Sequence, residues 1–66
     1  MKDYIVKYDG EEISEPVDVE EAKRIATEKL ATLTGNQYLL LWIMHQTDSK
    51  KSIFWSQKRN GYFECE

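Results

Sequence analysis

One apolar run constrains the fold of this chain more than any other feature. Residues 38–44 are seven consecutive apolar residues, preceded by Gly35 and Asn36 and followed by His45 and a polar stretch. A short run between turn-forming residues is typical of a β-strand that is buried on both faces. The run is also far too short to cross a membrane as a helix. We therefore predict a central strand over residues 38–45.

The segment before this run predicts a hairpin. Residues 2–8 have strand composition, and their alternation puts Tyr4, Val6 and Tyr8 on one face. The following Asp9-Gly10 dipeptide suits a two-residue type I′ turn, because both of its residues need a positive φ. A second strand over residues 12–17 would pair back on the first. Pro16 would confine that strand to the edge of the sheet, since proline cannot donate to a ladder.

A helix is predicted next. Asp18 is a suitable N-cap, Glu21 stands three residues later as in a capping box, and Gly35 would end the helix as its C′ residue. Arg24 can pair with Glu20 or Glu28, each four residues away. Apolar residues at helical spacing define one buried stripe: Val19, Ala22, Ile25, Ala26, Leu30 and Leu33.

Two more strands follow the central run. We predict one over residues 51–56 and one over residues 62–65, joined by a second type I′ turn at Asn60-Gly61. The predicted order is strand–strand–helix–strand–strand–strand. A single amphipathic helix has one stripe to bury, so the fold class is α+β, with one helix on one face of an antiparallel sheet. The 66 residues form a single domain, 1–66.

One helix cannot cover this sheet. A helix is about 10–12 Å across and strands lie about 4.8 Å apart, so the helix covers two to three strands. We assign Leu39, Leu41 and Ile43 to the helix side. The alternate residues of the strand would then lie on an uncovered face that is suited to an interface, unless the sheet curls and covers them itself: Tyr38, Leu40, Trp42 and Met44.

The charged residues are unevenly placed. Residues 1–21 carry two basic and eight acidic side chains, whereas residues 22–66 carry seven basic and four acidic ones. The basic residues form three small patches, Lys23 with Arg24, Lys50 with Lys51, and Lys58 with Arg59. Exposed aromatic residues near such patches can stack nucleobases, but the isoelectric point near 5.1 argues against direct nucleic-acid binding.

No catalytic or metal-binding pattern is visible in the sequence. His45 is the only histidine, and without a second histidine or a cysteine cluster there is no zinc constellation. We predict no enzymatic activity and no cofactor. The single Cys65 cannot form an intramolecular disulfide, and a strand pattern starts directly after Met1, so we expect a cytoplasmic protein.

The chain resembles small phage anti-CRISPR proteins that inhibit type I-F surveillance complexes. The matching features are residues 4–7, 22–26 and 53–55, an apolar strand after Gly35, Lys58 three residues before Gly61, and the ending at 63–65. The resemblance implies a protein that docks on the backbone subunits of a CRISPR RNA-guided complex and blocks target-DNA hybridisation. It also implies that Lys23 and Arg24 contact the target complex, together with Lys58.

The leading hypothesis is therefore a non-enzymatic phage inhibitor that acts in the cytoplasm of its host. Two other hypotheses stay open. The first is a small homodimeric, antitoxin-like or regulatory module joined through its sheet face. The second is a single-stranded nucleic-acid-binding domain. The candidate partner-binding residues are Lys23, Arg24, Lys58, Arg59, Tyr38 and Trp42.

Overall fold

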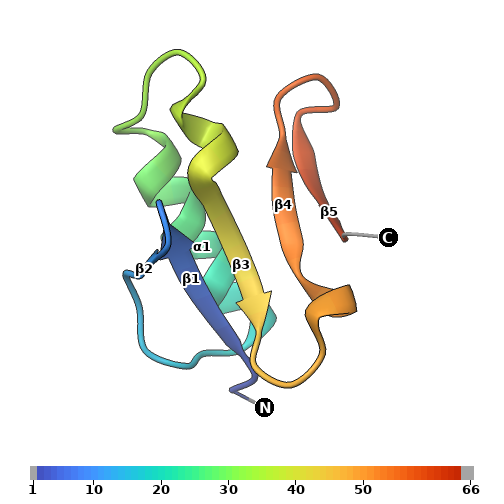
Figure 1. Cartoon of the computed structure of the whole chain (residues 1–66). Helices are drawn as coiled ribbons and strands as arrows, with labels where there is room; N and C mark the ends of the chain where they lie inside the picture. Colours follow the sequence, from blue (N-terminus) through green and yellow to red (C-terminus); the bar gives the residue numbers. More distant parts are fainter. Residues whose placement is uncertain (1, 65–66) are drawn as a thin grey trace.

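One helix packs against a five-stranded antiparallel sheet in the computed structural model, which describes residues 2–64 (Figure 1). The sheet order is β2-β1-β3-β4-β5, and the ββαβββ element order confirms the α+β prediction. The elements are β1 (Tyr4–Tyr8), β2 (Glu11–Glu12), α1 (Val19–Leu30), the 3₁₀ helix η1 (Gln37–Leu40), β3 (Leu41–His45), the 3₁₀ helix η2 (Ser49–Lys51), β4 (Ile53–Ser56) and β5 (Gly61–Glu64).

The first hairpin forms as predicted, but its second strand is short. Asp9 and Gly10 have φ values of 52° and 82°, as the type I′ turn requires. Only β2 then pairs regularly with β1. Further on, the hydroxyl of Ser14 accepts a hydrogen bond from the backbone N–H of Val6 at 3.0 Å. The predicted strand over residues 12–17 is therefore confirmed only at its two ends. Glu12 pairs with Lys7, the edge is irregular near Ser14 and Pro16, and Val17 exchanges backbone hydrogen bonds with Tyr4 at 2.8 and 2.9 Å.

Helix α1 begins where the sequence predicts and ends earlier. The Asp18 carboxylate accepts a hydrogen bond from the backbone N–H of Glu21 at 2.8 Å, which confirms the N-cap. The prediction that Gly35 ends the helix is wrong. The backbone N–H of Thr32 bonds to the carbonyl of Lys29 in a 3₁₀ turn, and the Thr32 hydroxyl bonds to the same carbonyl. Local bonds of this kind compete with helix continuation, and Gly35, at φ 60°, belongs to the loop that follows.

The central strand starts three residues later than predicted. In register, Tyr8 at the end of β1 faces Leu41, and β1 then turns away at Asp9. The Leu40 carbonyl still accepts a hydrogen bond from the backbone N–H of Asp9 at 3.0 Å, but residues 37–40 have no strand beside them and form the 3₁₀ helix η1. The assignment of Leu39 to the core is therefore wrong, since this side chain is 60% exposed, while Leu41 and Ile43 are buried as predicted.

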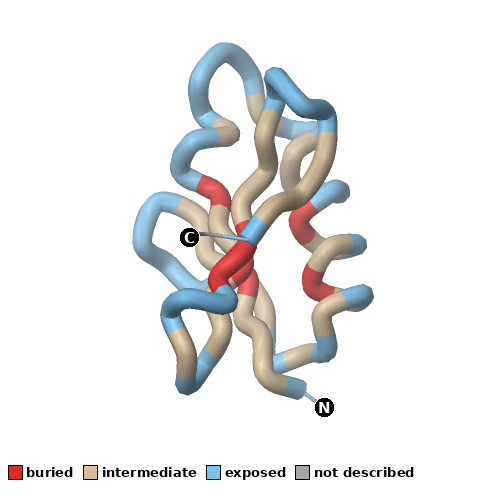
Figure 2. Tube along the Cα trace, turned by 90° about the vertical axis from the view of Figure 1, so that its right-hand side faces the viewer, coloured by how far each residue is buried: buried red, intermediate tan, exposed pale blue. Residues whose placement is uncertain are grey.

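The core is a row of aliphatic side chains under α1. Val6, Ile43 and Ile53 lie opposite one another on three neighbouring strands. Ala22 and Ala26 of α1 are fully buried, and their small side chains let the helix lie close to β1 and β3. Figure 2 shows these two buried turns of α1 facing the buried parts of the strands.

A tyrosine connects the far edge of the sheet to the helix. The Tyr62 hydroxyl of β5 lies 2.7 Å from the Thr27 hydroxyl and donates to the Lys23 carbonyl oxygen at 3.3 Å. Its ring packs edge to face on Trp55, with centroids 5.1 Å apart. Trp55 therefore faces the helix side, and Phe54 faces the opposite side.

Two predictions about the last hairpin need correction. Asn60 has φ 54°, but Gly61 is already part of β5, so Asn60-Gly61 is not a two-residue type I′ turn. Ser56 pairs with Gly61, which leaves a four-residue loop stabilised by a hydrogen bond from the Arg59 N–H to the Ser56 hydroxyl. β4 starts at Ile53 rather than residue 51, because Asp48 caps η2 just before it. Cys65 lies outside the described residues.

No helix within residues 2–64 is long and apolar enough to cross a membrane.

The core assignment predicts different costs for two aliphatic truncations. Ile43→Ala should lower the free energy of unfolding by about 2–5 kcal/mol, because it leaves a cavity in the core. Leu39→Ala should change it by about 0.5 kcal/mol or less, as is usual at exposed positions. Urea denaturation followed by circular dichroism measures both changes. Equal losses in the free energy of unfolding would mean that Leu39 is buried, which contradicts a β3 that starts at Leu41.

The Tyr62 contact predicts a pH-dependent stability. Burial raises the pKa of Tyr62, and its hydrogen bond to Thr27 partly opposes that shift. A raised folded-state pKa gives stability that is present below the unfolded pKa and is lost as the pH rises through the folded one. Tyr62→Phe should therefore lower the free energy of unfolding by about 1 kcal/mol at pH 7, and should lose less stability than the wild type between pH 7 and strongly alkaline pH.

Tyr38→Phe is the matched control, since Tyr38 makes no side-chain hydrogen bond to a described residue. Urea unfolding at both pH values gives the result. The same alkaline loss in Tyr62→Phe as in the wild type would show that another group carries the effect.

Candidate binding face

The side of the sheet that faces away from α1 carries a continuous row of side chains. We call this side the open face; in Figure 1 the helix lies behind β1 and β3. Strand register places Lys7 opposite Trp42, Trp42 opposite Phe54, and Phe54 opposite Phe63. The three rings, Trp42, Phe54 and Phe63, are called the aromatic row below.

The aromatic row is closely packed and ends in cations. The Trp42 and Phe54 ring centroids are 5.7 Å apart, and those of Phe54 and Phe63 are 6.4 Å apart. The Arg59 guanidinium lies over the Phe63 ring, 4.8 Å from its centroid. Lys7 stands at the other end, on β1. All three rings are half-buried rather than enclosed, so the open face offers apolar and cationic groups together.

A hollow of about 410 Å³ lies on the open face along β3, and we call it the groove. Its apolar wall consists of Leu40, Trp42 and Met44, so the residues predicted for an uncovered face do meet there, except for Tyr38. Tyr38 lies half-buried in η1. The other residues that line the groove are Lys7, Gly10, Ser49 and Ser52.

Ser52 is an unusual member of the groove wall. It is 3% exposed, and its hydroxyl has no hydrogen-bond partner among the described residues. A buried hydroxyl without a partner is costly, and such a group in a native structure calls for an explanation. The wall of the groove thus contains an aromatic ring, that of Trp42, and a buried hydroxyl that has no hydrogen-bond partner among the described residues.

The predicted site residues separate into two places. Trp42 lies in the aromatic row, and Lys58 and Arg59 lie in the β4–β5 loop, where Arg59 covers the end of that row. Lys23 and Arg24 lie on α1, on the other side of the sheet. The structure therefore brings Trp42 and Arg59 to one surface and places the helix pair on another.

No match was found when the chain was compared with protein-family models, curated proteins and solved structures. The residues of the two surfaces are therefore the basis for assigning a function.

Arg24 is held by carboxylates of its own helix. Its guanidinium pairs with Glu21, with Nε 2.5 Å from Oε1, and with Glu28. The pairing with Glu28 confirms the sequence prediction, but Glu21 is the second partner instead of Glu20. The hydrogen bond between Glu21 and Arg24 lowers the pKa of Glu21 and raises that of Arg24. Much of the charge of Arg24 is thus compensated within α1.

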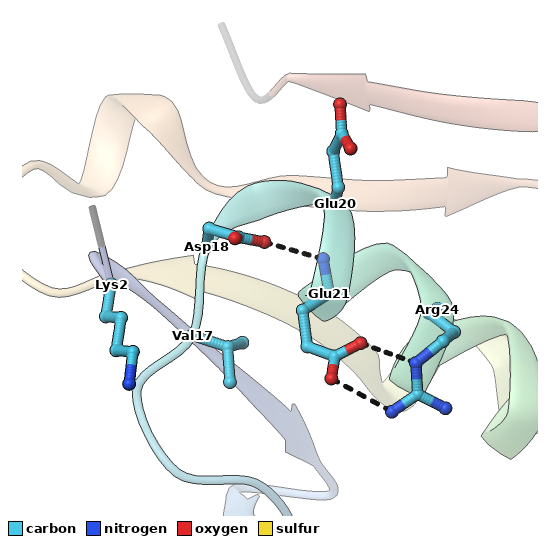
Figure 3. Close-up of a pocket in the computed structure, with 6 residues that line it drawn as sticks. All are labelled: Lys2, Val17, Asp18, Glu20, Glu21 and Arg24. Carbon is cyan, nitrogen blue, oxygen red and sulfur yellow. Dashed lines mark hydrogen bonds and ion pairs between the residues drawn. The ribbon is translucent and has the colours of Figure 1, made fainter.

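A second hollow, of about 550 Å³, lies beside this ion pair at the start of α1 (Figure 3). Two of its carboxylates already have partners, because Asp18 caps the helix and Glu21 holds Arg24. It therefore offers few free groups for a ligand. The lining residues are Lys2, Val17, Asp18, Glu20, Glu21 and Arg24.

His45 has a structural contact at the end of β3. Its Nδ1 accepts hydrogen bonds from the backbone N–H groups of Asp48 at 3.0 Å and Thr47 at 3.2 Å. Its ring packs edge to face on Tyr4 at 5.0 Å. Within residues 2–64, no group of three or more histidine, cysteine or acidic side chains is placed to hold a metal ion.

Sequence reasoning did not identify Lys7, Phe63 and Ser52 as parts of the candidate site. The alternation in β1 separates Lys7 from Val6, but only the register with β3 shows that Lys7 meets Trp42. Residues 53–55 are all apolar, so alternation alone does not say whether Phe54 or Trp55 faces outward. Register decides this, because Ile53 pairs with Ile43 in the core.

The unused hydroxyl gives a prediction about stability. Ser52→Ala should leave the free energy of unfolding unchanged or raise it by up to about 1 kcal/mol, because it removes a buried group without a partner. Ser56→Ala is the matched control, since its hydroxyl accepts from the Arg59 N–H, and should lower stability by about 0.5–1.5 kcal/mol. Thermal and urea unfolding measure both, and a clear loss in Ser52→Ala would mean that the hydroxyl has a partner.

Proposed function

We propose that this chain is a non-enzymatic inhibitor that occupies a surface of a host CRISPR RNA-guided surveillance complex and keeps target DNA from pairing. The observation that carries the binding role is the aromatic row on the sheet face that points away from α1. The resemblance to phage anti-CRISPR proteins supplies the class of target. The mechanism is steric and electrostatic, so it needs no cofactor.

The open face has the composition of an interface. Aromatic residues, methionine and arginine are enriched in interface cores, and Trp42, Met44 and Arg59 are such residues. Leu40 extends this apolar surface at the start of β3 with 44% of its area exposed, and its neighbour Leu39 in η1 is 60% exposed. Contiguous exposed apolar surface on a small domain usually marks an interaction site.

The two groups of basic residues have different roles in this proposal. Arg59 has its guanidinium on Phe63 and forms no ion pair with a described residue, so its charge is available to a partner of the open face. Lys58 is its neighbour in an exposed loop. Arg24 is already paired with Glu21 and Glu28, and we expect Lys23 and Arg24 to add less to binding than the open face does.

A homodimer that meets through the open faces is the alternative. The exposed Leu39 and Leu40 beside the groove favour it, since such side chains gain from mutual burial. Sedimentation equilibrium separates the two functions. A tight dimer that Trp42→Arg dissociates would support the homodimeric module, whereas a monomer supports the inhibitor.

The direct test is capture of a purified type I-F surveillance complex by the immobilised chain, combined with a target-DNA binding assay. The wild type should retain the complex and prevent DNA binding. Trp42→Ala should weaken capture by about 2 kcal/mol or more, as expected of a residue central to an interface. The matched variant is Lys23→Glu with Arg24→Glu, on the opposite surface.

The two variants also test which surface acts. If the variant with both Lys23→Glu and Arg24→Glu loses capture while Trp42→Ala keeps it, the interface lies on α1 and not on the open face. If the folded wild type does not retain any such complex, the proposed function is wrong.

A further inference from the structure

We propose that the open face is a stacking platform for two or three bases of single-stranded nucleic acid, with the sugar-phosphate backbone near Lys7 and Arg59. The inference rests on the proposed function in one respect, because it names the part of a nucleoprotein target that the open face would contact. Free oligonucleotides test it without that target, so either proposal can fail alone.

The length of the row fits this ligand. The aromatic row together with Lys7 runs from β1 to Phe63 on β5 and crosses three strand spacings, or about 14 Å at 4.8 Å each. Four-stranded sheets that bind RNA stack two or three bases on aromatic side chains of this kind of row. The row ends in the Arg59 guanidinium, whose plane is itself a stacking surface for a base.

The charges of the row fit a phosphate backbone. Lys7 and Arg59 stand at its two ends, and neither forms an ion pair with a described residue. Lys50 and Lys51 lie in η2, next to Ser49 and Ser52 of the groove. Glu12 on β2 lies opposite Lys7 in the strand register, without forming an ion pair with it. The net charge of −3 is that of the whole chain. Five of the acidic side chains belong to residues 15–28, the segment that includes α1, and not to the strands of the aromatic row.

The groove supplies what a base needs at its edge. A nucleobase has flat apolar faces that stack and a polar edge that must be hydrogen-bonded when it is buried. Trp42 forms an aromatic wall of the groove, and Ser49 and Ser52 are among the residues that line it. Ser49 is exposed, so its hydroxyl is the polar group that a base edge would reach, whereas the Ser52 hydroxyl is buried in the wall.

Fluorescence anisotropy with labelled single-stranded oligonucleotides, as DNA and as RNA, and with a duplex of the same sequence tests the proposal. We expect binding at low salt that favours the single strands. Phe63→Leu and Trp42→Leu keep an apolar side chain but remove the ring, and each should weaken binding about 5- to 150-fold. Lys7→Gln and Arg59→Gln should each reduce the slope of log affinity against log salt by about 0.7.

The matched control is Lys29→Gln, which removes one positive charge from α1 on the helix side of the sheet and should leave affinity and salt slope unchanged. Circular dichroism confirms that each variant is folded. The proposal is overturned if the folded wild type binds no oligonucleotide at low salt, if it binds the duplex as tightly as the single strand, or if Lys29→Gln loses affinity while Trp42→Leu keeps it. Capture of the surveillance complex without any oligonucleotide binding would overturn this inference and leave the proposed function standing.

Discussion

One geometric constraint governs the structure: a single α-helix, α1, packs against a sheet of five strands. Ala22 and Ala26 bring α1 close to β1 and β3, and there the helix covers Val6 and Ile43. Burial of these aliphatic side chains supplies the main driving force for folding a domain of this size. Because α1 is the single α-helix within residues 2–64, the side of the sheet that faces away from it has no α-helix over it.

The same constraint separates the aromatic residues into two groups with different roles. Trp55 and Tyr62 pack together on the helix side, and the Tyr62 hydroxyl reaches Thr27 and the Lys23 carbonyl, so they help to fix the sheet on the helix. Trp42, Phe54 and Phe63 contact one another on the open face, with a cation at each end. Those rings contribute to sheet stability through cross-strand pairing, but their position also leaves them available to a partner.

Much of the fold was predictable from local signals. The Asp9-Gly10 turn, the Asp18 cap and the spacing of Ala22 and Ala26 each act through neighbouring residues, and all were confirmed. The start of β3 was not predictable, because residues 38–40 are as apolar as the strand itself. Only the end of β1 opposite Leu41 determines where pairing can begin.

The candidate site was predictable only in part, for the same reason. Trp42 was identified because it alternates with Leu41 and Ile43, which have to be buried. Its neighbours Lys7, Phe54 and Phe63 come from three other strands, and their meeting is a result of register that no short segment encodes. The unpaired Ser52 hydroxyl is visible only when all of its surroundings are known.

The two tryptophans lie on opposite sides of the sheet, so their signals can test whether the open face is the binding surface. Their indole N–H signals can be followed in a ¹H–¹⁵N correlation spectrum while a single-stranded oligonucleotide is added. If the open face binds, the Trp42 signal and the amides of β3, β4 and β5 should shift together, while the Trp55 indole and the amides of α1 stay in place. A shift of the Trp55 indole and of the α1 amides, with the Trp42 signal unchanged, would show that the open face is not the binding surface.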